Sequence, residues 1–175
     1  MFAALDPVRY DWFLVFVPCV TGSLILLIQS ALHRFRSRAS WVLVDGSNVM
    51  HWKNGKADID TLREVLSELA GSGLKPAVVF DANAGYKLCD RYLDDRALGR
   101  LLDLPSSRVM VAPKGNPADP FILNAARDNK ARIVSNDRFR DWFDDFSDVL
   151  QTGALVSGGY KHGKLWLALE LGRET

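Results

Sequence analysis

The stretch WVLVDGSN (41–48) is the clearest indication of the fold. An unbroken apolar run, 41–44, is followed at once by the turn-forming pair Asp45-Gly46. A short apolar run that ends at a turn is typical of a strand buried on both faces of a sheet. The polar residues Ser47 and Asn48 are therefore expected just beyond the carboxyl end of a buried strand.

Further apolar runs and helical segments alternate along the rest of the chain. The expected strands, the last being the pair Val149-Leu150, lie at 77–80, 109–112, 133–135 and 149–150. The expected helices, the first with Thr61 and Glu64 as a capping box, lie at 59–69, 92–104, 121–127 and 139–143. This alternation predicts an α/β fold: a Rossmann-like α/β/α sandwich of three layers, with a central parallel sheet and right-handed crossovers. A hairpin turning near His162-Gly163 is expected within 154–171.

Composition excludes several classes of protein. The chain has 175 residues, which suits one domain of ordinary size with some chain left over. A hydrophobic share of 48% and a charged share of 25% exclude a disordered chain. The formal net charge of +1 means that a nucleic acid would be held by a local patch. The two cysteines exclude a disulfide scaffold and a cysteine-based zinc module.

Residues 12–32 predict a transmembrane helix. They contain no charged side chain, and a helix of about 20 residues spans a bilayer core. A buried core helix is disfavoured because a domain of this size rarely buries a helix that is apolar on every side. A cleaved signal peptide is disfavoured because the segment has no small-x-small cleavage site beside it. One arginine precedes the segment and three follow it, namely Arg9, then Arg34, Arg36 and Arg38. The positive-inside rule then predicts a single-pass membrane protein with a cytoplasmic C-terminal domain, at the inner membrane if the source is bacterial.

The expected organisation of the chain has five parts. These are a short flank at 1–11, the transmembrane helix at 12–32, a basic linker at 33–40, the α/β domain at 41–151 and a C-terminal hairpin or extension at 152–175.

Aspartates occur at or shortly after every expected strand end. Asp45 and Asp81 directly follow the first two strands, and Asp119, Asp137 and Asp141 follow the next two. Ligand sites in parallel α/β sheets lie beyond the carboxyl ends of the strands. Clustered carboxylates there suit Mg²⁺ or Mn²⁺ and indicate metal-assisted hydrolysis of a phosphodiester.

Each aspartate also has a structural interpretation that the sequence leaves open. Asp119 before Pro120 fits a helix N-cap, and Asp137 fits a cap for the segment that follows. Asp45 fits an ordinary Asp-Gly turn, with Asn48 bonding the backbone of that turn.

Three motifs together resemble the NYN/PIN-like ribonuclease superfamily, most closely the Regnase-type catalytic domain of CCCH zinc-finger endoribonucleases. They are VDGSNVM (44–50), PADPFIL (117–123) and IVSNDRFRD (133–141). The resemblance covers roughly residues 40–150. It implies a PIN-like fold and Mg²⁺-dependent endonucleolytic cleavage of RNA, with products that carry 5′-phosphate and 3′-hydroxyl. Asp45, Asp119, Asp137 and Asp141 would form the acidic metal cluster, and Asn48 would position a ligand or water.

This chain departs from the family pattern in two respects. The family often has two adjacent acids where this chain has Ala118-Asp119, and Asp81 is a candidate to compensate. There is no CCCH cluster, so RNA must be captured by other residues. Candidates for substrate binding, some basic and one aromatic, are Tyr86, Lys87, Lys114, Arg138 and Arg140. For the last two, surface pairing with Asp144 and Asp145 is an equal alternative.

The sequence therefore predicts a membrane-anchored, metal-dependent endoribonuclease that acts on single-stranded or loop RNA. The alternative is a catalytically weak or inactive PIN-like module that binds RNA or a protein at the membrane. Homo-oligomerisation is left open. No nucleotide cofactor is expected, because neither a Walker motif nor GxGxxG occurs.

Overall fold

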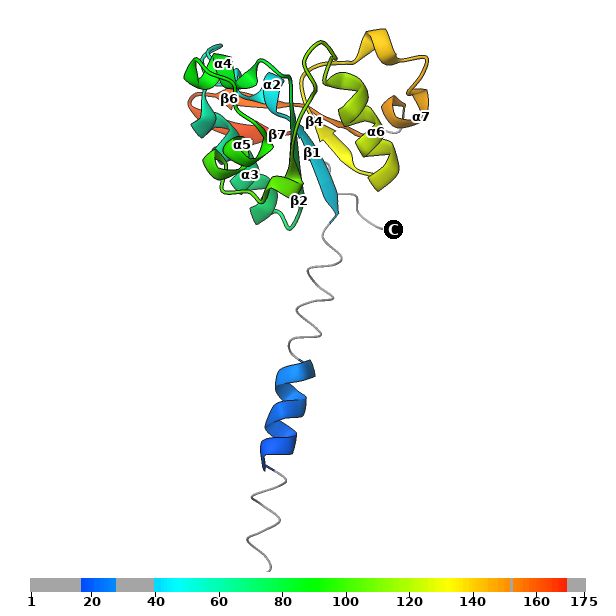
Figure 1. Cartoon of the computed structure of the whole chain (residues 1–175). Coiled ribbons are helices and arrows are strands. Elements are labelled where there is room, and N and C mark those ends of the chain that lie inside the picture. Colours follow the sequence, from blue (N-terminus) through cyan, green and yellow to red (C-terminus); the bar gives the residue numbers. More distant parts are fainter. Residues whose placement is uncertain (1–16, 28–39, 152, 170–175) are drawn as a thin grey trace, which may run out of the picture. The chain divides into compact units, whose positions relative to one another are not determined.

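The computed structural model describes residues 17–27, 40–151 and 153–169, and the chain divides into two compact units, Met1–Ala39 and Ser40–Thr175 (Figure 1). In the first unit, residues 17–27 form a helix whose apolar side chains are mostly exposed. Within these described ranges, no helix has both the length and the apolar character needed to cross a membrane. The two ends of the predicted transmembrane segment, 12–16 and 28–32, lie outside the described residues.

The second unit is built on a parallel sheet of five strands in the order β3-β2-β1-β4-β5. The strands are β1 (Trp41–Asp45), β2 (Lys75–Phe80), β3 (Val109–Val111), β4 (Arg132–Val134) and β5 (Leu155–Val156). Central β1 pairs Val44 with Val78 on one side and with Val134 on the other. Val44 is fully buried, so the predicted buried strand is confirmed.

Helices cover both faces of this sheet, which gives the predicted three layers (Figure 1). They are α2 (Gly46–Val49), α3 (Ile59–Gly71), α4 (Ala84–Cys89), α5 (Asp95–Leu101), α6 (Asp119–Asn129) and α7 (Ser147–Leu150), with single 3-10 turns at η1 (Ser106–Arg108) and η2 (Arg140–Trp142). One core cluster joins Val42 of β1 to Leu62 of α3, and the other joins Leu43 to Ile122 of α6. Successive residues of β1 thus serve opposite faces, as the pleat of a strand requires.

Several predicted elements differ from those observed. Val149-Leu150 belongs to α7, and the fifth strand is Leu155–Val156. The reason is topological, because a parallel neighbour must be entered from the amino edge, and the chain first has to return there from the end of β4. The helix predicted at 92–104 is the shorter α5, α4 was not predicted, and the helix predicted at 139–143 is only the 3-10 turn η2.

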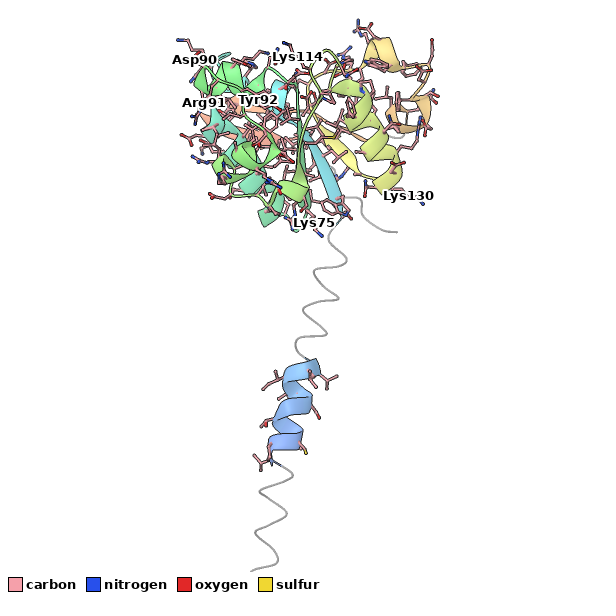
Figure 2. The ribbon with its side chains drawn as sticks, in the orientation of Figure 1. Lys75, Asp90, Arg91, Tyr92, Lys114 and Lys130 are labelled. Atoms are coloured by element: carbon pink, nitrogen blue, oxygen red, sulfur yellow. The ribbon has the colours of Figure 1, made fainter. Side chains whose placement is uncertain are left out.

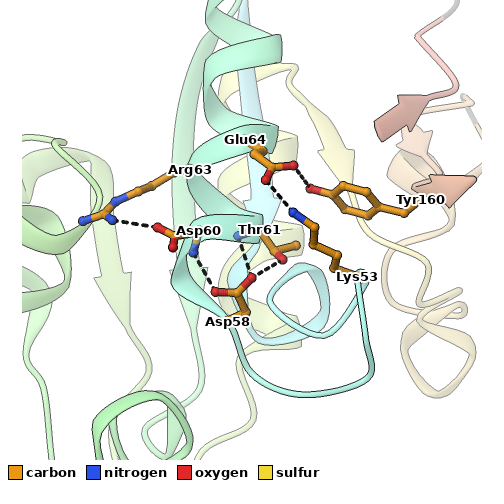
Figure 3. A network of polar contacts seen from close by, with 7 residues as sticks. All are labelled: Lys53, Asp58, Asp60, Thr61, Arg63, Glu64 and Tyr160. Carbon is orange, nitrogen blue, oxygen red and sulfur yellow. Dashed lines mark hydrogen bonds and ion pairs between the residues drawn. The ribbon is translucent and has the colours of Figure 1, made fainter. Parts of the chain in front are cut away.

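The N-terminus of α3 also differs from the prediction. Asp58 is the N-cap and accepts hydrogen bonds from the backbone of Asp60 (3.0 Å) and Thr61 (3.2 Å) and from the Thr61 hydroxyl (2.7 Å). The capping box of Thr61 and Glu64 is therefore wrong, because the helix begins earlier and Asp58 already satisfies these donors. Glu64 instead accepts hydrogen bonds from Lys53 Nζ (2.7 Å) and the Tyr160 hydroxyl (2.6 Å) (Figure 3).

The C-terminal hairpin is present as predicted. Its strands are β6 (Gly158–Lys161) and β7 (Lys164–Leu167), joined at His162-Gly163, both of which have positive φ. Two such residues in a two-residue loop suit the twist of a hairpin. Leu165 and Leu167 pack against the same core cluster as α3, and the bond from Tyr160 to Glu64 holds the hairpin on that helix.

Candidate active site

Asp45 is both the last residue of β1 and the N-cap of α2. Its Oδ1 accepts a hydrogen bond from the Asn48 backbone (3.1 Å), and its Oδ2 accepts one from the Ser135 hydroxyl (2.8 Å). Burial raises the pKa of the Asp45 carboxyl to about 6, and the nearby charges of Asp119 and Asp81 add to this increase. The turn-forming role that the sequence left open is therefore real, but the same carboxylate also lies in a cluster of acids.

Asp119 lies in the first turn of α6, where its side chain does not cap the helix. The N-cap is Ala118, which makes no side-chain capping bond. The Asp119 Oδ2 accepts a hydrogen bond from Trp142 Nε1 (3.1 Å) in η2. Burial raises the pKa of Asp119, and the negative charges of Asp137, Asp81 and Asp141 raise it further. The capping interpretation of Asp119 is thus wrong. Its pKa is instead raised by the charges of three other acids at the site.

Asp137 follows β4 and is held by its own turn. Its Oδ1 accepts a hydrogen bond from the Phe139 backbone (2.8 Å), and Phe139 itself is buried with a positive φ of 49°. This bond closes a turn over 137–139, whereas η2 begins at Arg140 with Phe139 as its N-cap and with no side-chain capping bond, so the capping interpretation of Asp137 is wrong. Asp141 is exposed one turn further along, within η2.

Ser135 links the Asp45 carboxylate to the backbone of Asp137, and the sequence analysis did not identify it. Its hydroxyl donates to Asp45 Oδ2 (2.8 Å) and accepts from the Asp137 backbone N–H (3.0 Å). The residue is almost fully buried. The only signal in the sequence was a serine directly before Asn136-Asp137, which is too common a pattern to interpret.

Asp81 lies beside the start of α6. Its Oδ1 accepts a hydrogen bond from the Ala118 backbone (3.3 Å), and its own N–H donates to the Ser47 hydroxyl (2.8 Å). The Ala118 side chain is buried in the core cluster of α6. Asp81 therefore places a carboxylate next to the position where the family often has a second acid.

Asn48 is held by two donors that meet its side-chain oxygen. Trp52 Nε1 donates to Oδ1 at 2.7 Å, and the Asn136 backbone donates to the same atom at 3.1 Å. The Asn136 side chain in turn makes two hydrogen bonds to the Gly158 backbone, at the first residue of the hairpin (2.8 and 3.1 Å). Trp52 and Asn136 are further residues that sequence reasoning missed: Trp52 lies only four residues from Asn48, whereas the partners of Asn136 are distant in the chain.

The predicted substrate-binding side chains apart from Asn48 are all exposed: Tyr86, Lys87, Lys114, Arg138 and Arg140. Lys114 lies in the loop between β3 and α6, at the carboxyl edge of the sheet (Figure 2). Among the ion pairs found in the described part of the chain, none involves these cations. The predicted alternative, pairing of Arg138 and Arg140 with Asp144 and Asp145, is therefore not seen there.

The chemical type of the donor atoms at this site suits a hard cation. Its atoms are carboxylate, amide and hydroxyl oxygens, and the mutual repulsion of the acids is charge that a cation would offset. In residues 17–27, 40–151 and 153–169, no three His, Cys, Asp or Glu side chains are grouped closely enough to hold an ion together. Mg²⁺ usually keeps several waters and contacts only one or two carboxylates, so the arrangement fits an ion held partly through water.

Comparison with known protein families identifies the family of this domain. The model of the family described as Zc3h12a-like ribonuclease NYN domain matches residues 38–156. The chain belongs to this family. The match runs from just before β1 to the end of β5 and includes every carboxylate described above. The resemblance inferred from VDGSNVM and IVSNDRFRD is confirmed, and the hairpin lies beyond the matched NYN domain.

Two solved structures have a similar fold. The crystal structure of nuclear proteinaceous RNase P 2 (PRORP2) from A. thaliana has a TM-score of 0.56 and 19% identity, over 94% of this chain and 36% of that chain. A second structure, Arabidopsis thaliana nuclear protein-only RNase P 2, has a TM-score of 0.50 and 19% identity, over 93% and 36%. This chain thus spans about a third of the length of PRORP2, and at this identity the likeness concerns the PIN-like fold alone. A comparison with curated protein sequences finds no significant match.

Proposed function

We propose that this NYN domain is an endoribonuclease that hydrolyses RNA phosphodiester bonds with the help of a divalent cation, Mg²⁺ or Mn²⁺. The observation that carries the proposal is the placement of carboxylates at the carboxyl edge of the sheet, where Asp45 ends β1 and Asp81 follows β2, and where nearby acids raise the pKa of Asp119. Unpaired acids that repel one another are costly in a folded protein, and such clusters are typical of functional sites. Membership of a ribonuclease family supports RNA as the substrate.

Each residue has a part in this proposal. One or two of Asp45, Asp119 and Asp137 would contact the cation directly, and the remaining acids, Asp141 and Asp81 among them, would act through water. Bound there, the ion would supply positive charge for the phosphate oxygens and lower the pKa of a water molecule. Ser135 keeps Asp45 and Asp137 in fixed orientations, because its hydroxyl is bonded to both residues.

Side chains around the acids would position the RNA substrate. The Asn48 oxygen is already engaged by Trp52 and Asn136, so its amide N–H₂ is the group free to face a phosphate or water. Lys114, Arg138 and Arg140 would contact backbone phosphates. Lys87 would do the same from α4, where the exposed ring of Tyr86 offers a surface for an unpaired base.

The test is cleavage of a labelled single-stranded RNA by the purified full chain in Mg²⁺, in Mn²⁺ and in EDTA. We expect cleavage that needs the metal and that Asp137→Asn reduces by about 100-fold or more, because loss of a ligand to the cation costs several kcal/mol of stabilisation in the transition state. Asp144→Asn is the matched control, because it removes an exposed acid that takes no part in the cluster. Cleavage by Asp137→Asn at the wild-type rate would show that the acids are assigned wrongly.

The alternative is a domain that binds RNA, or a protein, without cutting. It is favoured by Ala118, which is buried where the family often has an acid. Retention of labelled RNA without cleavage in either metal would establish this alternative for RNA. A chain that neither binds nor cleaves RNA would point to a protein partner.

We also propose that residues 12–32 anchor the chain in a membrane, with the NYN domain on the cytoplasmic side. The absence of charge across this segment and the three arginines after it support this proposal. The described part of the segment, 17–27, is helical, and its apolar side chains are mostly exposed.

A further inference from the structure

The C-terminal hairpin has a solvent-facing side to which the proposed nuclease site assigns no role. In the antiparallel pair β6 and β7, Gly159 lies opposite Trp166, and Lys161 lies opposite Lys164. Opposite residues point to the same side, as do alternate residues of one strand, so these four share a face. We call this face the hairpin strip.

Trp166 forms an open aromatic surface within the hairpin strip. The residue is 47% exposed. A Cβ atom built on Gly159 would lie 3.5 Å from Trp166 Nε1 and 3.8 Å from the nearest ring carbons, so the indole lies against the glycine. The indole thus lies beside Gly159 and is still exposed to solvent over nearly half of the residue. Such a platform suits stacking with an unpaired base, since every base has an aromatic face.

The two lysines of the strip form a like-charged pair. Lys161 and Lys164 are directly opposite each other and exposed, an arrangement that is unfavourable unless an anion lies nearby. Across the described residues, neither lysine takes part in an ion pair. Their charges are therefore available to a phosphate backbone.

The hairpin is fixed to the carboxylate site. Gly158 is bonded through both its N–H and its carbonyl to Asn136, the residue before Asp137. From Gly158 to Lys161 is three strand residues, about 10 Å. The Tyr160 hydroxyl bond to Glu64 and the position of Lys53 over the Tyr160 ring, at 5.2 Å, keep the hairpin on α3 (Figure 3). The hairpin that carries the strip is thus fixed, through Asn136, to the loop that carries Asp137.

We infer that the hairpin strip is an accessory binding surface for single-stranded RNA, with Trp166 stacked on a base and Lys161 and Lys164 contacting phosphates. The inference rests on the proposed function, because the carboxylate site is what makes RNA the polymer at this edge. The strip lies outside the matched residues 38–156, so it adds to the NYN domain a surface for RNA beyond the cleaved bond. Short substrates that end before the strip do not use it.

The first experiment measures binding of the full chain to a labelled single-stranded RNA in EDTA, where cleavage is not expected. Trp166→Ala is expected to weaken binding by about 5- to 100-fold, while Trp166→Phe keeps most of the affinity. The double variant Lys161→Gln with Lys164→Gln lowers the slope of log affinity against log salt by about 0.7 for each phosphate that a lysine no longer neutralises. Met110→Ala and Lys130→Gln, an exposed apolar residue and an exposed cation away from the strip, serve as controls and leave binding unchanged.

A second experiment measures cleavage of a long and a short RNA. Trp166→Ala is expected to raise KM for the long RNA and to leave KM for the short RNA and both kcat values unchanged, which a general loss of folding would not do. Equal affinity and salt slope in the wild type and all strip variants would overturn the inference, even if the wild type cleaves RNA. If the strip variants lost binding to anionic lipid vesicles but bound RNA as tightly as the wild type, the inference would also be overturned, and the strip would be a lipid-binding surface. Strip-dependent binding without any cleavage would support the strip and count against the nuclease.

Discussion

Single side chains in this NYN domain show why the acids at the site must be considered together. Asp45 has a pKa near 6 in the folded chain, against an ordinary value of 3.8, chiefly because it is buried. The Ser135 hydroxyl opposes this increase, because it donates to the ionised form. The pKa of this carboxyl therefore reflects burial, which raises it, opposed by hydrogen bonds from Ser135 and from the Asn48 backbone.

Replacement of Ser135 by alanine tests that hydrogen bond. Ser135→Ala is expected to raise the pKa of Asp45 further, so the acidic limb of the pH–rate profile moves to higher pH. The variant also loses about 1–3 kcal/mol of stability, because the Asp45 oxygen and the Asp137 N–H lose a buried partner. The measurement is cleavage rate against pH, with Ser135→Thr as the control that keeps a hydroxyl. An unchanged acidic limb in Ser135→Ala would mean that Asp45 does not govern activity.

The raised pKa of Asp45 also predicts how stability depends on pH. The folded state holds the Asp45 proton more tightly than the unfolded state, so unfolding releases a proton between about pH 4 and pH 6. The contribution of Asp45 to the free energy of unfolding therefore falls as pH rises through this window, by about 1.4 kcal/mol per unit and by about 3 kcal/mol in all.

Asp45→Asn removes this pH dependence. In EDTA, the variant is expected to be more stable than the wild type near neutral pH and to differ little from it near pH 4, as measured by urea unfolding. Added Mg²⁺ is expected to reverse the order by stabilising only the wild type, because the variant lacks the charge that attracts the ion. A constant difference between the two proteins across this pH range would contradict the assignment of a raised pKa to Asp45.

At the scale of elements, the turn from β1 into α2 depends on the close approach of Gly46 to a neighbouring strand. A Cβ atom at Gly46 would lie 2.3 Å from the ring of Phe80, a fully buried residue of β2. Only a residue without a side chain lets the backbone carry Asp45 and Asn48 this near the end of β2. The apolar core thus sets the position of the polar site directly.

Gly46→Ala tests this packing. The variant is expected to lose about 1–3 kcal/mol of stability, because the Phe80 ring has to leave a well-packed position. Gly71→Ala, at the last residue of α3 with no neighbour within 4 Å of its Cβ, is the matched control and is expected to be neutral or slightly stabilising. Urea unfolding midpoints compare the two variants. Equal midpoints would show that the Phe80 ring can move away from residue 46 without loss of stability.

At the scale of the whole molecule, the proposed anchor would restrict cleavage to RNA near a membrane. Deletion of residues 12–32 is expected to move the chain from the membrane fraction to the soluble fraction without lowering cleavage of a short RNA. The physical reason is that the core clusters on both faces of the sheet, and every acid of the site, lie within residues 40–175. Fractionation of cells that express the two forms is the measurement. A full chain found in the soluble fraction would exclude the anchor.

Local patterns were enough to predict much of this protein. The run WVLV predicted the central strand, and Asp45 is the last residue of β1 while Asp81 directly follows β2. A carboxyl-edge position could be predicted for them because strand direction and parallel pairing place all such ends together. The motifs that carry the family resemblance lie in these same short segments, so the NYN family could be inferred without the structure.

Only the tertiary structure decided which side chains hold the acids and where the chain closes the sheet. Ser135 donates to a carboxylate 90 positions away, and Trp142 reaches Asp119 across 23 positions. The fifth strand is Leu155–Val156 and not Val149-Leu150, because the route back to the amino edge depends on the packing of α7. Hydrogen-bond partners and return paths depend on contacts between distant segments, which form only when the chain folds, whereas strand periodicity and turn chemistry are properties of neighbouring residues.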